Sequence, residues 1–166
     1  MQNDKITIRK ARISDVPIIV ELFDKFMEEH KKIVLQRNSR QEQHVKRKNN
    51  SRNIFKSFIE KNITSSKSIV NVAHVNGKIA GYALSYIKDG PAVYKVDKVG
   101  YISDLYVIKD FRGKGIATRF KNEAFRFFRK KGIRFKSIMA NPENKHARYI
   151  YKKWGFFDFH IEMRKD

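Results

Sequence analysis

Apolar residues recur along this chain with two different periods, and each period predicts one type of element. Between Lys5 and Lys10 they alternate with polar residues, which predicts a first strand. The apolar residues that follow recur at helical spacing: Ile18, Ile19, Leu22, Phe23, Phe26 and Met27. Ser14 and Asp15 stand before this helix as candidate N-cap residues, and Pro17 suits its first turn because a missing N–H is harmless there.

The middle of the chain predicts a second helix and a β-hairpin. The helix is expected within Arg40 to Asn62, with a polar, basic first half that has the composition of a loop. Ile69 to Val75 alternates as a strand and Lys78 to Ile87 returns as its partner. Asn76-Gly77 between them is typical of a two-residue hairpin turn.

The remaining third of the chain continues with strands and helices in alternation. The expected elements are a strand Gly100–Val107, a helix Gly113–Lys131 stopped by Gly132, a strand Arg134–Ala140, a helix Asn144–Trp154 and a final strand Phe156–Met163. The order β-α-α-β-β-β-α-β-α-β predicts an α/β (α+β mixed) fold, with a central twisted mixed sheet flanked by helices. We expect one domain over residues 1–166.

Composition narrows the class of protein. A chain of 166 residues with 41% hydrophobic and 13% aromatic residues can build its own core. The lack of Cys excludes a disulfide scaffold, a thiolate zinc site and a cysteine nucleophile. The five His are scattered without metal-ligand spacing, so no metal is expected. There is neither a run of 18 apolar residues nor a signal-type stretch in Met1 to Lys10, so we expect a soluble, cytoplasmic protein.

The formal net charge of +20 is the unusual property of this composition. Most of the excess lies in two stretches, with +8 between Lys31 and Lys56 and +9 between Lys109 and Lys136. Such a field attracts phosphorylated cofactors, nucleic acids and acidic membranes. The first stretch has no aromatic residue before Phe55, so any nucleic-acid contact there would be mainly to phosphate. A solvated face selected for solubility is the simpler alternative.

The segment from Ile102 to Thr118 predicts an anion site. It reads as a strand, a short turn and then Gly113-Lys114-Gly115-Ile116-Ala117 at the start of a helix. Unpaired backbone N–H groups at a helix N-terminus bind anions, and small residues let a pyrophosphate approach them closely. The glycines could instead serve turn geometry alone. The spacing matches neither a P-loop nor a dinucleotide-binding fingerprint.

Two motifs give the chain a resemblance to a known family. Arg112-x-x-Gly115-x-Ala117 resembles the Arg/Gln-x-x-Gly-x-Gly/Ala signature of the GCN5-related N-acetyltransferases, the GNAT family. A second matching element follows about 30 residues later, as Asn144-x-x-Ala147-x-x-x-Tyr151-x-x-x-Gly155-Phe156. The expected element order extends this resemblance over nearly the whole chain, and it is weakest between Lys31 and Lys61.

The resemblance implies a binding site for acetyl-CoA as cosubstrate, in a wedge between two splayed strands. Backbone groups of Leu105, Tyr106 and Val107 would bind the pantetheine arm, and Asn144 would hydrogen-bond the arm near the second motif. The pyrophosphate would be wrapped by N–H groups of the turn: Gly113, Lys114, Gly115, Ile116, Ala117 and Thr118. Arg112 would add positive charge to the same turn.

The resemblance also implies two catalytic residues. Tyr151 would act as general acid on the leaving thiolate, a task that suits a phenol still protonated at neutral pH. Asp104 is the candidate general base, although Ser103 replaces the first acid of the acidic pair that some polyamine-acetylating members carry. Simple alternation would place Asp104 on one face with Ile102 and Tyr106, where it could also be solvated or paired with a lysine. Met139 stands where members that acetylate protein N-termini often carry an acid.

The function implied is transfer of an acetyl group to a primary amine, by direct attack in a ternary complex. The acceptor, a small molecule or a protein, is left open. Long-range repulsion by a +20 protein disfavours free polyamines unless a local acidic pocket overrides it. The rival hypothesis is a nucleic-acid- or ribosome-associated basic module on the same fold with little or no catalysis. A homodimer through the final strand, which carries Phe156, Phe157 and Phe159, is a further possibility.

Overall fold

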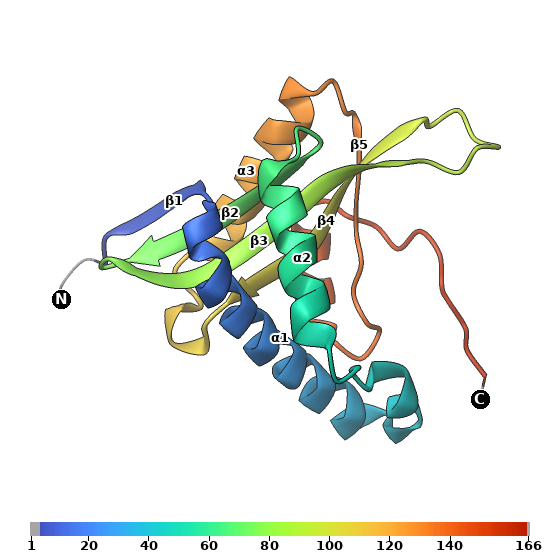
Figure 1. Ribbon diagram of the computed structural model, residues 1–166. Coiled ribbons are helices and arrows are strands. Elements are labelled where there is room, and N and C mark those ends of the chain that lie inside the picture. The colour runs from blue at the N-terminus through green and yellow to red at the C-terminus, as the bar shows by residue number, and fades with distance from the viewer. Residues whose placement is uncertain (1–3, 166) are drawn as a thin grey trace.

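A computed structural model describes residues 4–165; residues 1–3 and 166 of the expected domain lie outside this description. Five strands form one sheet in the order β1-β2-β3-β4-β5, antiparallel except for the parallel pair β4 and β5. The strands are β1 (Ile6–Lys10), β2 (Ser68–Val75), β3 (Lys78–Asp89), β4 (Lys98–Val107) and β5 (Phe135–Ile138). The α-helices of the described part are α1 (Val16–Arg37), α2 (Ser51–Thr64), α3 (Ile116–Lys130) and α4 (Lys145–Lys153) (Figure 1).

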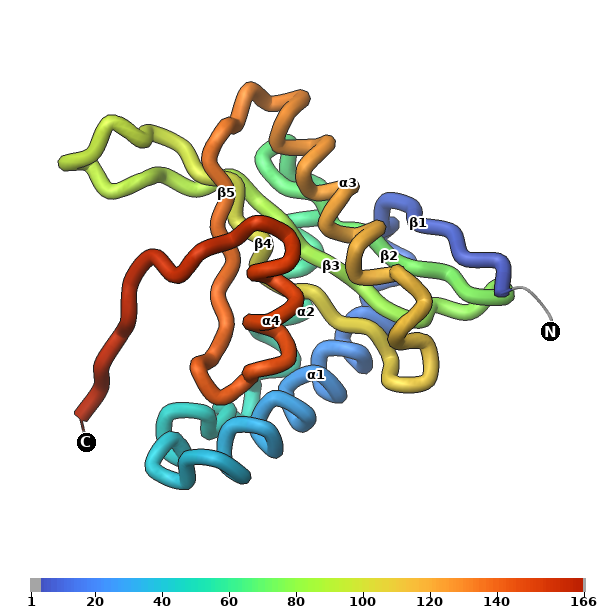
Figure 2. The backbone as a smooth tube through the Cα atoms, turned by 180° about the vertical axis from the view of Figure 1, so that it is seen from behind, coloured from blue at the N-terminus to red at the C-terminus, as the bar shows by residue number. Residues whose placement is uncertain are grey.

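Helices cover both faces of the sheet, which confirms the expected mixed sheet flanked by helices. α1 and α2 lie on one face, and α3 and α4 lie on the other (Figures 1 and 2). The α1–α2 side buries the largest cluster, which includes Ile19, Leu22, Ile59 and Tyr82. The opposite side is filled from α3, whose Ile116, Phe120 and Phe128 are buried. No helix among residues 4–165 is both long and apolar enough to cross a membrane.

Several expected boundaries shift where local signals are weak. The helix expected from Gly113 begins only at Ile116, because Gly113 and Gly115 adopt positive φ angles of 78° and 77°. The basic stretch after α1 forms two short 3-10 turns, so the second helix runs over Ser51–Thr64. The expected hairpin turn is confirmed, with Asn76 and Gly77 at φ angles of 50° and 84°.

The expected final strand, Phe156–Met163, is wrong. Residues 156–165 have no regular secondary structure. Phe156 still packs against the core on the α3 side, and the segment after it runs away from the sheet (Figure 2). The alternation that suggested a strand leaves apolar side chains exposed: Phe157 79%, Phe159 75%, Ile161 84% and Met163 90%. Alternation predicts a strand only when a partner strand and a buried face are supplied, and the described chain supplies neither to this segment.

Asp15 begins α1 by a different contact from the expected cap. Its carboxylate accepts a hydrogen bond from the Arg12 backbone N–H at 2.7 Å and two from the Arg9 guanidinium, at 2.7 and 2.9 Å. These contacts close the 3-10 turn Ile13–Asp15 and join it to β1. The Arg9 hydrogen bonds hold the pKa of Asp15 below its usual 3.8, against burial, which raises it.

Asp15→Asn is therefore expected to lower the free energy of unfolding by about 1–3 kcal/mol at neutral pH, since it removes charge-assisted hydrogen bonds. Because the folded pKa is lowered, this stabilisation is complete above the ordinary value of 3.8 and is lost as pH falls through the folded value. Urea unfolding of both proteins between pH 7 and pH 3 measures the difference. A difference in unfolding free energy that stays constant down to pH 3 would contradict the role assigned to the Asp15 carboxylate.

A β-bulge in β4 decides which side chains share a face. The β3–β4 pairing skips one residue of β4, Ser103. Ile102 therefore packs among residues of α3, whereas Asp104 points to the other face and meets Tyr82. The expectation that Ile102, Asp104 and Tyr106 share one face is wrong for Ile102, because an inserted residue reverses the alternation on one side of it.

The sheet opens beyond this bulge. The β4–β5 ladder runs from Val99–Phe135 to Ile102–Ile138 and ends there. The rest of β4, up to Val107, has no strand beside it on that edge within the described chain, so its backbone groups there lack the hydrogen bonds of a ladder. This free edge of β4 is called the opening below.

Gly100 lets α3 approach β4 just before this opening. A Cβ at Gly100 would stand 2.6 Å from the Phe128 ring, inside contact distance. We expect Gly100→Ala to lower the free energy of unfolding by about 1–3 kcal/mol through overpacking. Phe128→Leu should restore part of this loss in the double variant, and thermal unfolding of the four proteins measures the coupling. If the two substitutions changed the stability of the double variant additively, the Phe128 ring would not be what a Cβ at Gly100 meets.

Candidate functional site

The turn before α3 has the geometry of an anion site. Gly113 and Gly115 hold left-handed conformations, and a Cβ placed on either would meet no other atom within 4 Å. The backbone there is consequently open to an approaching ligand. Gly115 is the N-cap of α3, so the N–H groups of Ile116, Ala117 and Thr118 lack acceptors inside the helix. The positive end of the helix dipole adds to their attraction for an anion.

Arg112 is engaged by the protein itself. Its Nη2 donates to Glu29 Oε2 at 2.6 Å and its Nε donates to the Val107 carbonyl at 2.8 Å. Glu29 also accepts from the Tyr106 hydroxyl at 2.7 Å. Burial would raise the pKa of Glu29, but the Arg112 and Tyr106 hydrogen bonds outweigh it and hold that pKa below its usual range. The guanidinium thus braces the turn against α1 and β4.

Two other basic side chains near the turn are also held by the protein. Lys114 forms an ion pair with Asp4, and Arg119 donates to the Ile6 carbonyl at 2.9 Å. The turn therefore offers chiefly its backbone N–H groups to a ligand. Sequence reasoning missed Glu29, because its partner Arg112 lies 83 residues away in the chain.

Leu105, Tyr106 and Val107 form the end of β4 beside the opening. Val107 and the ring of Tyr106 are buried, and Leu105 is half-buried. Their side chains therefore serve the core, while their backbone forms the free edge of β4. Asn144, which follows β5 in the chain, is the N-cap of α4, where its Oδ1 accepts from the Ala147 N–H at 3.1 Å. The side-chain NH₂ of Asn144 is left to donate.

Tyr151 projects from α4 among aromatic rings. Its ring centroid lies 5.6 Å from that of Trp154 and 6.5 Å from that of Phe156. Burial, with a smaller influence from Tyr101, raises the pKa of Tyr151 to about 12. The phenol is accordingly protonated throughout the physiological range.

Asp104 lies half-buried beside the opening and is hydrogen-bonded by neutral groups. The Tyr82 hydroxyl donates to Oδ2 at 3.2 Å, and the Ser103 hydroxyl donates to Oδ1 at 3.2 Å. The alternative of a lysine partner is not observed: among residues 4–165, no basic side chain forms an ion pair with this carboxylate. Burial raises the pKa of Asp104, and the two hydroxyl groups offset this only in part.

The two candidate catalytic residues are linked through a group of tyrosines. The charge of Asp104 raises the pKa of Tyr82, Tyr86 and Tyr101, in each case after the larger effect of burial. Tyr101 in turn contributes to the raised pKa of Tyr151. β3, β4 and α4 thus contribute phenols and one carboxylate that influence one another's pKa. Sequence reasoning missed Tyr82, Tyr86 and Tyr101, although tyrosines at alternating spacing on expected strands were a usable signal.

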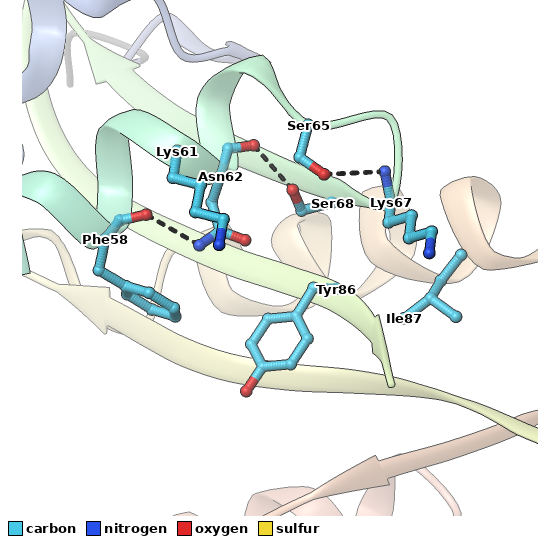
Figure 3. A pocket seen from close by; sticks show the side chains of 8 residues that line it. All are labelled: Phe58, Lys61, Asn62, Ser65, Lys67, Ser68, Tyr86 and Ile87. Atoms are coloured by element: carbon cyan, nitrogen blue, oxygen red, sulfur yellow. Dashed lines mark hydrogen bonds between the residues drawn. The ribbon is translucent and has the colours of Figure 1, made fainter. Parts of the chain in front are cut away.

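A shallow cavity of about 350 Å³ lies next to this group, between α2 and the strands β2 and β3. Its lining residues are Phe58, Lys61, Asn62, Ser65, Lys67, Ser68, Tyr86 and Ile87 (Figure 3). Tyr86 is shared with the tyrosine group: its hydroxyl points away from α2 toward β4 (Figure 3). The Tyr86 ring also stacks edge-on against Tyr101, with centroids 5.3 Å apart. The cavity therefore adjoins the tyrosine group through Tyr86.

The basic stretch from Lys31 to Lys56 is partly neutralised. Arg47 and Arg52 both form ion pairs with Asp24 of α1. Arg47 also lies over the Phe23 ring, 5.1 Å from its centroid. These contacts give two of the nine basic side chains of this stretch a structural role between α1 and α2. The structure offers nothing that favours the nucleic-acid hypothesis over catalysis.

Comparison with known proteins agrees with this geometry. The model of the acetyltransferase (GNAT) family matches residues 21–156. An uncharacterized N-acetyltransferase of Methanocaldococcus jannaschii is 36% identical over 87 residues, which cover 51% of this chain and 37% of that protein. An uncharacterized N-acetyltransferase of Bacillus subtilis is 21% identical over 151 residues, covering 91% of this chain and 89% of the relative.

Solved structures share the fold. A predicted acetyltransferase of Clostridium acetobutylicum, crystallised with acetyl-CoA, superposes with a TM-score of 0.77 at 20% identity, covering 98% of this chain and 96% of that one. The aminoglycoside N-acetyltransferase AAC(6')-Iy in complex with CoA gives a TM-score of 0.75 at 16% identity, covering 99% and 96%. With the family model matched over most of the chain, this protein belongs to the GNAT family of N-acetyltransferases.

Proposed function

We propose that the protein transfers the acetyl group of acetyl-CoA to a primary amine, by direct attack of the amine on the thioester. The observation that carries this proposal is the open glycine turn at the N-terminus of α3, which follows the end of β4 that has no strand beside it within the described chain. An anion-binding turn next to an exposed strand edge suits a long ligand with a pyrophosphate at one end. The acetyl-CoA bound to the Clostridium acetobutylicum structure supports the same assignment.

The residues present fit this cosubstrate. The N–H groups of the turn would hold the pyrophosphate: Gly113, Lys114, Gly115, Ile116, Ala117 and Thr118. The backbone of Leu105, Tyr106 and Val107 would bind the pantetheine arm along the free edge of β4, and the Asn144 amide would donate to it from α4. Arg112 would act by holding the turn in place through Glu29 and the Val107 carbonyl.

Acetyl-CoA, when bound, supplies an activated acetyl thioester whose C–S bond breaks as the bond from the amine nitrogen to the acetyl carbon forms. Asp104 would take the proton that the amine must lose, directly or through one water, and its raised pKa makes it a better base than an ordinary aspartate. Tyr151 would donate its hydroxyl proton to the departing sulfur. Solvent then restores both residues. Direct attack needs no thiol nucleophile from the enzyme, which agrees with a chain that has no cysteine.

The proposal is tested by titrating the purified protein with acetyl-CoA in a calorimeter and then supplying a panel of primary amines. We expect saturable, micromolar binding and release of free CoA thiol that depends on the amine. A thiol reagent can follow this release without background, because the protein contributes no thiol. Folded protein that shows no saturable acetyl-CoA binding, but binds RNA with a steep salt dependence, would overturn the proposal in favour of the nucleic-acid module.

A further inference from the structure

The cavity beside α2 differs in charge from the group of tyrosines that it adjoins. Its walls carry two lysines, Lys61 and Lys67, and none of the residues that line it is acidic. Both lysine side chains extend toward β3, Lys61 next to Asn62 and Lys67 next to Ile87 (Figure 3). A chain with 37 basic residues has other lysines outside ion pairs, so the feature that matters is that these two ammonium groups share one cavity.

The end of α2 does not need these lysines as caps. A helix C-terminus leaves backbone carbonyl groups without partners, and lysine side chains often satisfy them. Here hydroxyl groups do so instead. The Thr64 hydroxyl is shared between the Glu60 and Lys61 carbonyl groups, at 3.3 and 3.2 Å. The Ser68 hydroxyl donates to the Asn62 carbonyl at 2.8 Å. The two ammonium groups are consequently left to meet a ligand.

No carboxylate among residues 4–165 forms an ion pair with either lysine. Lys98 lowers the pKa of Asp89 and forms an ion pair with it, and Lys67 adds only a smaller effect. Glu60, next to Lys61 in the sequence, pairs with Lys56. Two like charges in one cavity repel each other, and an anion placed between them is attracted to both. The cavity is therefore electrostatically complementary to an anionic group.

The other walls of the cavity suit a carbon skeleton. The Phe58 and Tyr86 rings meet edge-on, with centroids 6.4 Å apart, and Ile87 adds an aliphatic surface. The Asn62 amide donates to the Phe58 carbonyl at 2.8 Å and has a second N–H to offer. A volume of about 350 Å³ with apolar walls and few polar groups is typical of a small-molecule site. A ligand with one apolar part and one anionic end fits this lining.

Tyr86 connects this cavity to the proposed base. Asp104 lies opposite Leu84 on the neighbouring strand, and Tyr86 is two residues further along β3 on the same face of the sheet. Side chains related by such a diagonal stand about 7–8 Å apart. An acceptor whose amine lies at Asp104 must therefore extend past the Tyr86 ring to bring an anion to the lysines. Several bonds must separate its nitrogen from its anionic group.

We propose that Lys61 and Lys67 form an anion-binding subsite for the acceptor, which selects primary amines that carry a carboxylate or phosphate group several bonds from the nitrogen. The inference rests on the proposed acetyl transfer, whose acceptor it specifies. Lysine ammonium groups act as point charges without a fixed bidentate geometry, so both kinds of anion suit them. The acetylation experiment below distinguishes the two.

The first experiment measures binding without acetylation. 3-Phenylpropanoate has an anionic end and an apolar ring but no amine, and 3-phenylpropan-1-ol is its neutral counterpart. With the full chain, ligand-detected NMR should show saturable binding of the carboxylate. The alcohol should bind about tenfold more weakly, because it loses the attraction of two partly exposed ammonium groups. Equal binding of the two compounds would overturn the subsite.

Paired variants locate the anion. The double variant Lys61→Gln with Lys67→Gln should weaken 3-phenylpropanoate binding by about tenfold, because it removes both charges and keeps the side-chain length. Lys78→Gln with Lys130→Gln removes the same charge at two exposed positions outside the cavity and should leave binding within about twofold. This control accounts for the general field of the +20 protein. Equal affinities of the two double variants would overturn the subsite.

Acetylation assays separate failure of the subsite from failure of the proposed function. 6-Aminohexanoate and 5-aminopentylphosphonate are each compared with n-pentylamine, which has the same carbon chain without the anion. We expect at least one anionic amine to have a KM about tenfold lower than n-pentylamine, with the lower value identifying the preferred anion. Glycine should be a poor acceptor, because its carboxylate is too close to its nitrogen.

The KM advantage of the anionic amine should disappear in the Lys61→Gln, Lys67→Gln protein and persist in the Lys78→Gln, Lys130→Gln protein. If all three amines share one KM in the wild type, acetyl transfer stands and the acceptor subsite is wrong. If acetyl-CoA itself does not bind, the proposed function fails, and with it the claim that the ligand of this cavity is an acceptor. The binding of 3-phenylpropanoate then shows whether the cavity is an anion site.

Discussion

Gly115→Glu is expected to abolish acetyl-CoA binding while the protein stays folded. The substitution puts a carboxylate at the N-cap of α3, among the N–H groups proposed to hold the pyrophosphate. Juxtaposed like charges cost several kcal/mol, and about 3 kcal/mol corresponds to a loss of about 100-fold in affinity. Calorimetric titration of wild type and variant with acetyl-CoA measures the change.

The loss must be separated from backbone strain, because Gly115 has a φ of +77° that a side chain disfavours. Gly132 provides the control: it lies just past the other end of α3 with a φ of +71°, and a Cβ there also meets nothing within 4 Å. Gly132→Glu carries similar strain and the same charge. If both variants lose acetyl-CoA binding equally, the turn before α3 is not the pyrophosphate site.

Tyr151→Phe is expected to lower kcat by about 100-fold or more and to leave acetyl-CoA affinity nearly unchanged. The hydroxyl proton is the group proposed to reach the leaving sulfur, and general acid catalysis contributes about 10²–10⁴ in rate. The phenylalanine ring keeps the contacts with Trp154 and Phe156, so packing is preserved. Steady-state rates of thiol release, with binding followed by calorimetry, separate the two effects.

The pKa of Tyr151 adds a test in pH. Since that pKa is about 12, the residual activity of the variant and the activity of wild type should both rise with pH as the amine loses its proton. Wild-type activity should not decline at any pH below 10 through loss of the Tyr151 proton, because Tyr151 keeps that proton there. Tyr149→Phe, on the same helix but 58% exposed, is the matched control and should retain wild-type rates. A Tyr151→Phe enzyme as fast as this control would remove Tyr151 from the mechanism.

Features determined by neighbouring residues could be predicted from the sequence. The Asn76-Gly77 turn, the glycines that open α3 and the N-cap Asn144 all form as the local signals indicate. Each depends on the conformational preference or hydrogen-bonding capacity of one or two residues. The strand order along the chain and the site-bearing turn follow from such signals, and so does the family.

Features determined by contacts between distant segments could not be predicted from the sequence. The final strand is the clearest case, because its alternation at Phe157 and Phe159 is present but the partner strand is not. Asp104 is another: the bulge at Ser103 arises from pairing with β3 and reverses the side of the sheet on which the carboxylate lies. The contact between Glu29 and Arg112 spans 83 residues and left no signal in either segment.

The sequence by itself thus determined the type and order of nearly all elements, the anion-binding turn and the identity of the candidate acid and base. Only the tertiary structure decided that Arg112 braces the turn through Glu29 and that Asp104 faces the opening among tyrosines. The physical reason is the range of the interactions. Turns and caps are stabilised within a few residues, whereas the partner and surroundings of a charged side chain are set by whichever strand or helix packs against it.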